Sequence, residues 1–190
     1  MAYQLTYLDV LQALFIPFNM SFWALNMGIY IIIGFILWRG TISMKKWYRV
    51  MLVLASVIIF LLAMFLVGVS NEGDGWQLSE QEIRIKAWPI EETADLKTVQ
   101  IALVSPWSEW QPTLRTNGYS VPGLSTGWFK LRNGKKAAIF YHQNPPDMLL
   151  LKSGDTYYIL AHPGVRELYM KLLQQGVKKY DLSISQVAFR

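Results

Sequence analysis

Two long apolar runs near the start of the chain are separated by a short basic segment. The first run extends from Phe15 to Trp38 and the second from Val50 to Val69, and neither contains Asp, Glu, Lys or Arg. A membrane hydrocarbon core of about 30 Å needs about 20 apolar residues in a helix, and both runs reach that length. The pattern predicts a short leader over residues 1–13 and a two-helix transmembrane hairpin over residues 14–69.

The pattern changes at Ser70, where a polar, glycine-containing stretch predicts a linker over residues 70–75. Beyond the linker, apolar and polar residues form segments of strand length. The predicted strands are 82–88, 99–104, 127–131, 137–141, 148–151 and 157–160. Asn133-Gly134, between two of these segments, is a strong signal for a β-hairpin.

A different period follows the last predicted strand. Val165, Leu168 and Leu172 are spaced as on one face of a helix, which we expect to begin at Pro163 and to end at Gly176. The fold class is therefore mixed: a transmembrane helical hairpin, then a mainly-β domain over residues 76–176 with a C-terminal amphipathic helix. The tail, residues 177–190, either adds a strand or stays mobile.

The formal net charge of +5 has an uneven distribution along the 190 residues. The leader carries −1, the segment 39–49 carries +4, and residues 70–190 carry +2. The four basic residues of the segment are Arg39, Lys45, Lys46 and Arg49. Short loops rich in Lys and Arg stay in the cytoplasm, so we expect loop 39–49 inside, and the N-terminus and C-terminal domain outside. Membrane topology thus accounts for most of the excess positive charge. The net charge therefore gives no reason to expect a nucleic-acid partner.

Three stretches of the predicted β domain carry a family resemblance. They are Arg115-Thr116-Asn117-Gly118-Tyr119, Val121-Pro122-Gly123-Leu124, and residues 127–137 around the Asn-Gly turn. Together with the last strand and helix, they resemble a bacterial pleckstrin-homology (PH-like) domain family whose members are often attached to membrane segments. The resemblance covers about residues 76–175, with His162-Pro163 where the family tends to have Ser-Pro. It implies a PH-like barrel and membrane association, and it implies no catalytic activity, cofactor or defined ligand.

The residues of the chain give no sign of an enzyme. There is no cysteine, which excludes disulfides, thiolate metal sites and cysteine nucleophiles. His142 and His162 lie twenty residues apart and outside any metal-binding spacing, so we expect no metal site. Glu91 and Glu92 are adjacent and would point to opposite faces of a strand. We expect neither a catalytic residue nor a cofactor.

The candidate binding surface is a basic region between Trp110 and Pro146 that contains no acid. Its members are Arg115, Lys130, Arg132, Lys135 and Lys136, with Trp107 and Trp110 close by in the sequence. One interpretation is capture of an anionic ligand by charge-assisted bonds. The two tryptophans are then either contact residues for a partner or ordinary packing residues of the domain. The other is a solvated hairpin tip whose charges keep a strand edge from pairing with other chains.

The leading functional hypothesis is a binding or scaffold module anchored by two spans in a bacterial cell membrane. Its partner would be a protein, a peptide or an anionic surface ligand, and a homo-oligomer stays open. The alternative is an immunity or resistance factor against membrane-active peptides. A surface hydrolase is the weakest hypothesis, because the groups that such chemistry requires are missing from the sequence.

Overall fold

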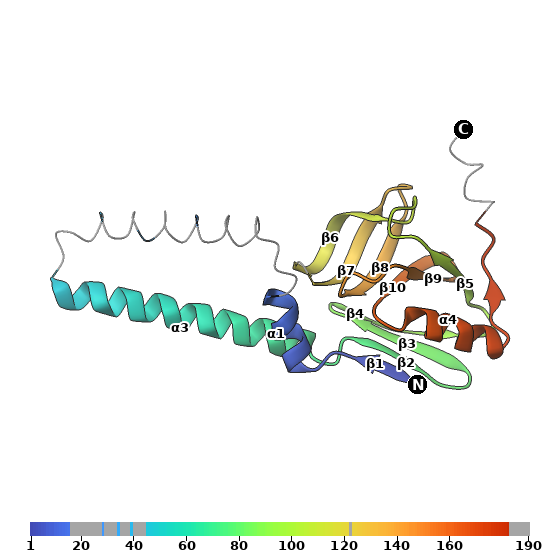
Figure 1. The fold of residues 1–190 in the computed structure, drawn as a ribbon, viewed down its shortest axis with the longest axis horizontal. Helices are drawn as coiled ribbons and strands as arrows, with labels where there is room; N and C mark the ends of the chain where they lie inside the picture. The colour runs from blue at the N-terminus through green and yellow to red at the C-terminus, as the bar shows by residue number, and fades with distance from the viewer. Residues whose placement is uncertain (16–27, 29–33, 35–38, 40–44, 122, 183–190) are drawn as a thin grey trace.

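The computed structural model describes residues 1–15, 28, 34, 39, 45–121 and 123–182 (Figure 1). The helices are α1 (Tyr7–Phe15), α3 (Lys46–Asn71) and α4 (Val165–Gln174). The strands are β1 (Ala2–Gln4), β2 (Gly75–Leu78), β3 (Glu82–Ala87), β4 (Ile90–Asp95), β5 (Gln100–Val104), β6 (Pro112–Val121), β7 (Leu124–Leu131), β8 (Lys136–His142), β9 (Met148–Ser153), β10 (Thr156–Ala161) and β11 (Lys178–Lys179).

Helix α3 projects away from the β domain (Figure 1). Its 26 residues give it a length of about 39 Å at 1.5 Å per residue. The stretch Lys46–Ala63 is long and apolar enough to cross a membrane, and none of it is buried. This helix contains the second predicted apolar run, but it already begins at Lys46, inside the segment predicted as a loop. The first predicted span, residues 15–38, lies outside the described residues except for Phe15, which ends α1, and positions 28 and 34.

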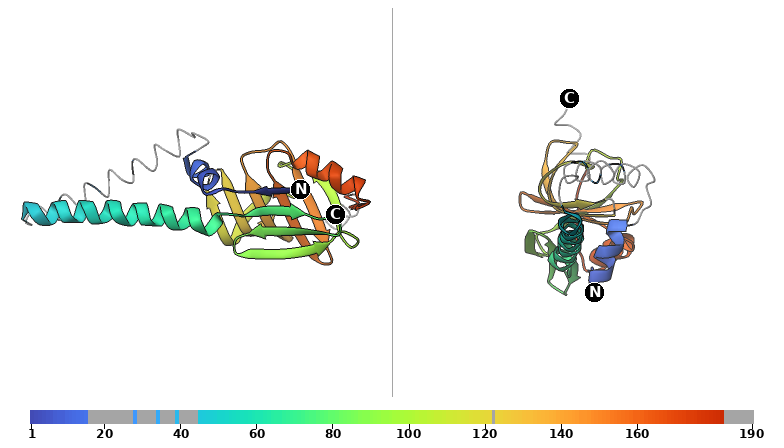
Figure 2. Two further views of the ribbon diagram at one scale, coloured as in Figure 1. Left: turned by 90° about the horizontal axis from the view of Figure 1, so that it is seen from below. Right: turned by 90° about the vertical axis from the view of Figure 1, so that its left-hand side faces the viewer.

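The strands form two sheets that share a core. Seven strands are ordered β11-β5-β9-β10-β8-β7-β6, and four are ordered β1-β2-β3-β4. Neighbouring strands are antiparallel except for the parallel pairs β8–β10 and β5–β11. In the view along α3, the four-stranded sheet, α1 and α4 lie on one side of the seven-stranded sheet (Figure 2). The mainly-β architecture and its helix agree with the predicted PH-like domain.

Each face of the seven-stranded sheet has its own apolar cluster. The larger cluster fills the space between the two sheets and includes Ile83 of β3, Phe140 of β8 and Leu168 of α4. The smaller cluster lies on the open face and includes Phe129 and Ile139. Residues of one strand therefore alternate between a closed interior and a face that the four-stranded sheet leaves uncovered.

The N-terminal segment completes the four-stranded sheet. Strand β1 pairs with β2 in the antiparallel sense, and the amides of Leu5 and Leu78 donate to Asp74 and Met1 carbonyls at 2.8 and 2.7 Å. Leu5, Val10 and Ala13 are buried in the larger cluster. The predicted leader thus contains a strand and a helix that belong to the core of the β domain.

Local capping explains why α1 begins where it does. The Thr6 hydroxyl accepts a hydrogen bond from the Asp9 amide at 3.2 Å, and the Asp9 carboxylate accepts one from the Thr6 amide at 2.8 Å. This reciprocal arrangement satisfies backbone donors that a helix N-terminus leaves free. Tyr7 of α1 then contacts Phe65 of α3, with ring centroids 6.2 Å apart. Helix α1 therefore bridges the β domain and the domain-proximal end of α3.

The predictions for the C-terminal part follow the local signals closely. Helix α4 buries Val165, Leu168 and Leu172, as the spacing predicts, but it begins at Val165 with Gly164 as its N-cap rather than at Pro163. The Asn133-Gly134 turn joins β7 to β8, with the Leu131 amide 2.8 Å from the Lys135 carbonyl. In the tail, β11 pairs with β5, so residues 178–179 add a strand. Residues 183–190 lie outside the described residues.

Two histidines lie in a buried layer beneath β1. His142 is 3% exposed, and its Nδ1 lies 2.6 Å from the Tyr3 hydroxyl. His162 is 1% exposed and accepts a hydrogen bond from the Trp76 indole at 2.7 Å. The His162 ring also stacks on Tyr3, with centroids 4.3 Å apart. Burial lowers the pKa of both imidazoles below the ordinary value of 6.5.

This layer predicts a pH-dependent stability. Because both histidines hold fewer protons when folded, the free energy of unfolding should fall as the pH drops through about 6.5. Burial raises the pKa of Asp74 to about 6. Asp74 therefore contributes in the opposite direction: its part of the free energy of unfolding rises as the pH falls below about 6. We expect the double variant His142→Gln, His162→Gln to lose the fall between pH 7 and pH 6 in guanidinium unfolding of the detergent-solubilised protein. An unchanged slope would show that protonation acts elsewhere.

Candidate binding groove

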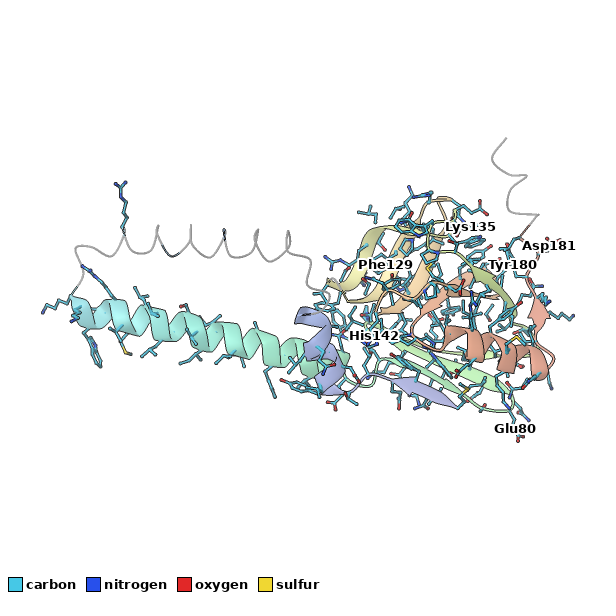
Figure 3. The ribbon with its side chains drawn as sticks, in the orientation of Figure 1. Glu80, Phe129, Lys135, His142, Tyr180 and Asp181 are labelled. Carbon is cyan, nitrogen blue, oxygen red and sulfur yellow. The ribbon has the colours of Figure 1, made fainter. Side chains whose placement is uncertain are left out.

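An open groove of about 950 Å³ lies on the face of the seven-stranded sheet that the four-stranded sheet leaves uncovered. Its floor is formed by Phe129, Ile139 and Met148, which belong to the smaller apolar cluster. Figure 3 labels Phe129 and His142, which lie on opposite faces of this sheet. The complete lining is Pro106, Trp107, Gln111, Pro112, Thr113, Leu114, Arg115, Ser120, Ser125, Phe129, Ile139, Tyr141, Asn144, Pro145, Pro146 and Met148.

Strand β6 forms one wall of the groove and pairs only with β7 among the described strands. Its register has irregularities between Pro112 and Leu114 and between Arg115 and Asn117. Arg115 stands opposite Phe129 in this register, and directly opposed residues of an antiparallel pair lie on the same face. Arg115 is therefore on the groove side of the sheet, above the apolar floor.

The loop before β6 carries Trp107, which is 77% exposed at the rim of the groove. Arg132 holds this loop in place by donating to the Trp107 carbonyl at 3.2 Å and to the Gln111 side chain. Within the loop, the Ser105 hydroxyl accepts a bond from the Trp107 amide at 3.2 Å. Arg132, a predicted ligand-binding residue, thus makes contacts inside the protein that fix the position of Trp107.

Trp110 lies inside the smaller cluster and is 1% exposed, so it is not part of the exposed surface. Its ring contacts Tyr157 and Tyr180 at centroid distances of 5.3 and 5.9 Å. The Lys135 ammonium lies 4.9 Å from the Trp110 ring centroid and donates to the Tyr157 hydroxyl at 3.1 Å. Lys135 and Tyr180 lie close together in Figure 3. The second predicted contact tryptophan therefore anchors the loop from within.

The ammonium of Lys135 changes the acidity of its partners. Burial alone would lower the pKa of Lys135, but its hydrogen bond to Tyr157 and the nearby phenols raise it. In Tyr157, burial favours a higher pKa, yet the bond from Lys135 makes the net shift downward. Both shifts reflect a charge-assisted bond that holds the β7–β8 turn against β10.

Lys130 and Lys136 are on the other face of the sheet. The Lys136 ammonium lies 4.7 Å from the ring centroid of Trp128, which packs against the larger cluster. Lys130 and Lys136 are opposed across β7 and β8 and therefore share a face. The fold therefore divides the predicted basic region. Arg115 lines the groove, Arg132 holds the loop that carries Trp107, and Lys135 holds the β7–β8 turn. Lys130 and Lys136 lie on the opposite face of the sheet.

Sequence reasoning did not find the rest of the groove lining. Tyr141 lies near the end of β8, and Asn144, Pro145 and Pro146 follow that strand. Ser120 and Ser125 face each other across β6 and β7 with hydroxyl oxygens 2.8 Å apart. The Asn-Pro-Pro stretch marks a loop in the sequence, but no local signal places it opposite β6. Only the fold brings these segments together.

The architecture defines a class of protein: a PH-like β domain with a groove on the open face of its larger sheet. Residues 75–176, more than half of the chain, match the model of the bacterial PH domain family. The chain belongs to this family, which suggests a binding or scaffold module, since PH domains are generally non-catalytic. Neither a curated protein nor a solved structure gives a significant match. The matched segment does not include β1 and α1, which complete the core.

Proposed function

We propose that this protein is a membrane-anchored binding module of a bacterial cell, with α3 as one of two spans and the groove as its ligand site. The exposed apolar surface of α3 is the observation that carries the anchor. Along α3, Val53, Ile58 and Ile59 are each more than 60% exposed. Lipid removes such a surface from water, whereas a soluble monomer rarely leaves so large an apolar area uncovered.

The pairing of β1 with β2 supports a second span. Strand β1 precedes α3 in the chain and β2 follows it, yet both belong to one sheet. The N-terminus and the β domain must therefore lie on the same side of any membrane that α3 crosses. The chain between residues 15 and 46 then has to cross as well, which agrees with the first apolar run, residues 15–38.

The junction between anchor and domain is short and fixed. Asn71, the last residue of α3, is 2% exposed, and its side-chain oxygen accepts a bond from the Thr126 hydroxyl at 3.3 Å. The same hydroxyl lies 3.1 Å from the Trp88 carbonyl. These contacts tie the helix end to β7 and to the β3–β4 turn. A ligand in the groove would be held close to the membrane rather than on a loose tether.

The orientation rests on the basic residues between the two apolar runs. Arg39, Lys45, Lys46 and Arg49 favour the cytoplasmic side, which puts the N-terminus and the β domain outside the cell. At the outer surface, the accessible partners are proteins, peptides and anionic surface ligands. The groove supports binding rather than hydrolysis, because the described residues of its lining include no histidine or carboxylate to act as a general base.

The charge of the groove distinguishes the immunity alternative from the leading proposal. Membrane-active peptides that are attracted to anionic lipid carry basic residues. Arg115 would repel such a peptide, and the region from Trp110 to Pro146 contains no acid to attract it. Interception of a cationic peptide in this groove is therefore disfavoured, and general ligand capture is the better-supported role.

Single cysteines test the anchor, because the natural chain has none. We expect a membrane-impermeant maleimide to label Ala2→Cys and Asp155→Cys in intact cells, and Ser43→Cys only after lysis. Labelling of the first two positions on opposite sides would contradict the hairpin. Labelling of all three on one side would contradict the spans, and the reverse pattern would move the β domain into the cytoplasm.

A further inference from the structure

Of the described residues that line the groove, Arg115 is the one that carries a charge. Among the described residues it has no ion pair, whereas the arginines of β3 and α4 are paired with Glu91 and Asp147. Its position opposite Phe129 places a cation beside an apolar floor. A ligand that fills this groove is complementary if it carries an acid next to apolar groups.

Aromatic and proline side chains form the walls. Trp107 and Tyr141 lie in the lining together with Pro106, Pro112, Pro145 and Pro146. Aromatic-lined grooves of this composition accept extended, proline-containing peptides, which lose little conformational entropy on binding. Arg132 already holds the loop that carries Trp107. A ligand therefore does not have to order this loop, and the entropy cost of binding is smaller.

The polar part of the lining favours a peptide over an acyl chain. Gln111, Thr113, Ser120, Ser125 and Asn144 all lie in the lining, mixed with the apolar side chains. Each of these side chains already has a hydrogen-bond partner within the protein, but each also keeps a further donor or acceptor position. An acyl chain would cover that remaining capacity without forming hydrogen bonds, which is costly. The backbone amides of an extended peptide supply both donors and acceptors for them.

We infer that the groove binds an extended, proline-containing acidic peptide segment of a partner protein, with its carboxylate on Arg115 and an apolar side chain between Trp107 and Tyr141. This inference rests on the proposed binding role and names its ligand class. Arg132 acts as a positioning residue, because its guanidinium holds the loop that carries Trp107.

A random octapeptide library on phage, selected on the immobilised, detergent-solubilised full-length protein, tests the inference. We expect enrichment of peptides that combine proline, an apolar residue and Asp or Glu. Against Arg115→Glu the selected charge should change to Lys or Arg, and Trp107→Ala should weaken a selected acidic peptide roughly tenfold or more in fluorescence polarisation. Lys97→Glu, an exposed change outside the groove, should leave selection and affinity unaltered.

Two outcomes would overturn the peptide assignment. Absence of enrichment, or enrichment that Arg115→Glu and Trp107→Ala leave unchanged, removes the groove as a peptide site. Lysophosphatidylglycerol micelles serve as the lipid probe. If they bind in a way that depends on Arg115 and Trp107, and no peptide does, the groove remains a binding site for a different ligand. If neither probe depends on these residues, the proposed binding site fails as well, whereas the anchor is judged by the cysteine labelling.

Discussion

Replacing Gly75 with alanine should release β1 from the four-stranded sheet. A Cβ at Gly75, where φ is +147°, would lie 1.9 Å from the Tyr3 carbonyl oxygen, so β1 has to move away. The segment that leaves carries Leu5 and Val10, which are buried in the core. Full burial of two such side chains is worth about 3 to 6 kcal/mol, and we expect the free energy of unfolding to fall by about that amount.

A cross-strand disulfide measures this release directly. Ala2 and Gln77 are opposite each other in β1 and β2, next to the hydrogen-bonded pair Met1–Leu78. We expect Ala2→Cys with Gln77→Cys to form a disulfide under oxidation, and Gly75→Ala to prevent it. Gly154→Ala is the matched control, since its φ is +56° and no atom lies within 4 Å of its Cβ. Equal crosslinking in all three proteins would contradict the release of β1 by Gly75→Ala.

Replacing Gly127 with alanine should separate β6 from β7 and remove a wall of the groove. At φ +111°, a Cβ on Gly127 would lie 2.3 Å from the Asn117 carbonyl oxygen and 2.6 Å from the Gly118 Cα. Both contacts are with backbone, which cannot rotate away as a side chain can. Strain and overpacking together predict a loss of about 3 to 5 kcal/mol in the free energy of unfolding.

Chemical denaturation of the detergent-solubilised protein checks this loss. Gly134→Ala provides the control, because Gly134 also has a positive φ, +80°, but open space around its Cβ. Backbone strain alone should cost about 1 kcal/mol there. A similar stability of the two variants would mean that the close approach of β6 and β7 is not required.

Local patterns predicted those elements whose two faces differ in burial. In β3, Ile83 and Ile85 point inward whereas Glu82 and Arg84 are exposed, and α4 buries one side. Strand β6 is largely exposed and has two register irregularities, so its alternation is interrupted. Strand β1 is short and finds its partner only beyond α3. Neither carries a periodic signal that could be recognised without the fold.

The candidate site was predictable in composition but not in arrangement. Arg115, Lys130 and Lys135 form one basic region in the sequence, yet strand alternation and the hairpin turn distribute them to different surroundings. Trp110 lies in a Pro-bounded loop, which suggests exposure, but Tyr157 and Tyr180 pack against its ring. Charge along the chain gives the sign of a surface, whereas tertiary packing decides which charges share it.

The pairing of β1 with β2 also sets an order of events during synthesis. The ribosome makes β1 first, but its partner emerges only after the whole of α3. Until then, Leu5 and Val10 have no core to enter.

If the proposed hairpin inserts with the wrong number of crossings, the two strands end on opposite sides of the membrane and the sheet stays open. Such a chain would expose apolar residues to the proteases and chaperones that remove misassembled membrane proteins. Closure of the four-stranded sheet would then act as a checkpoint for correct insertion.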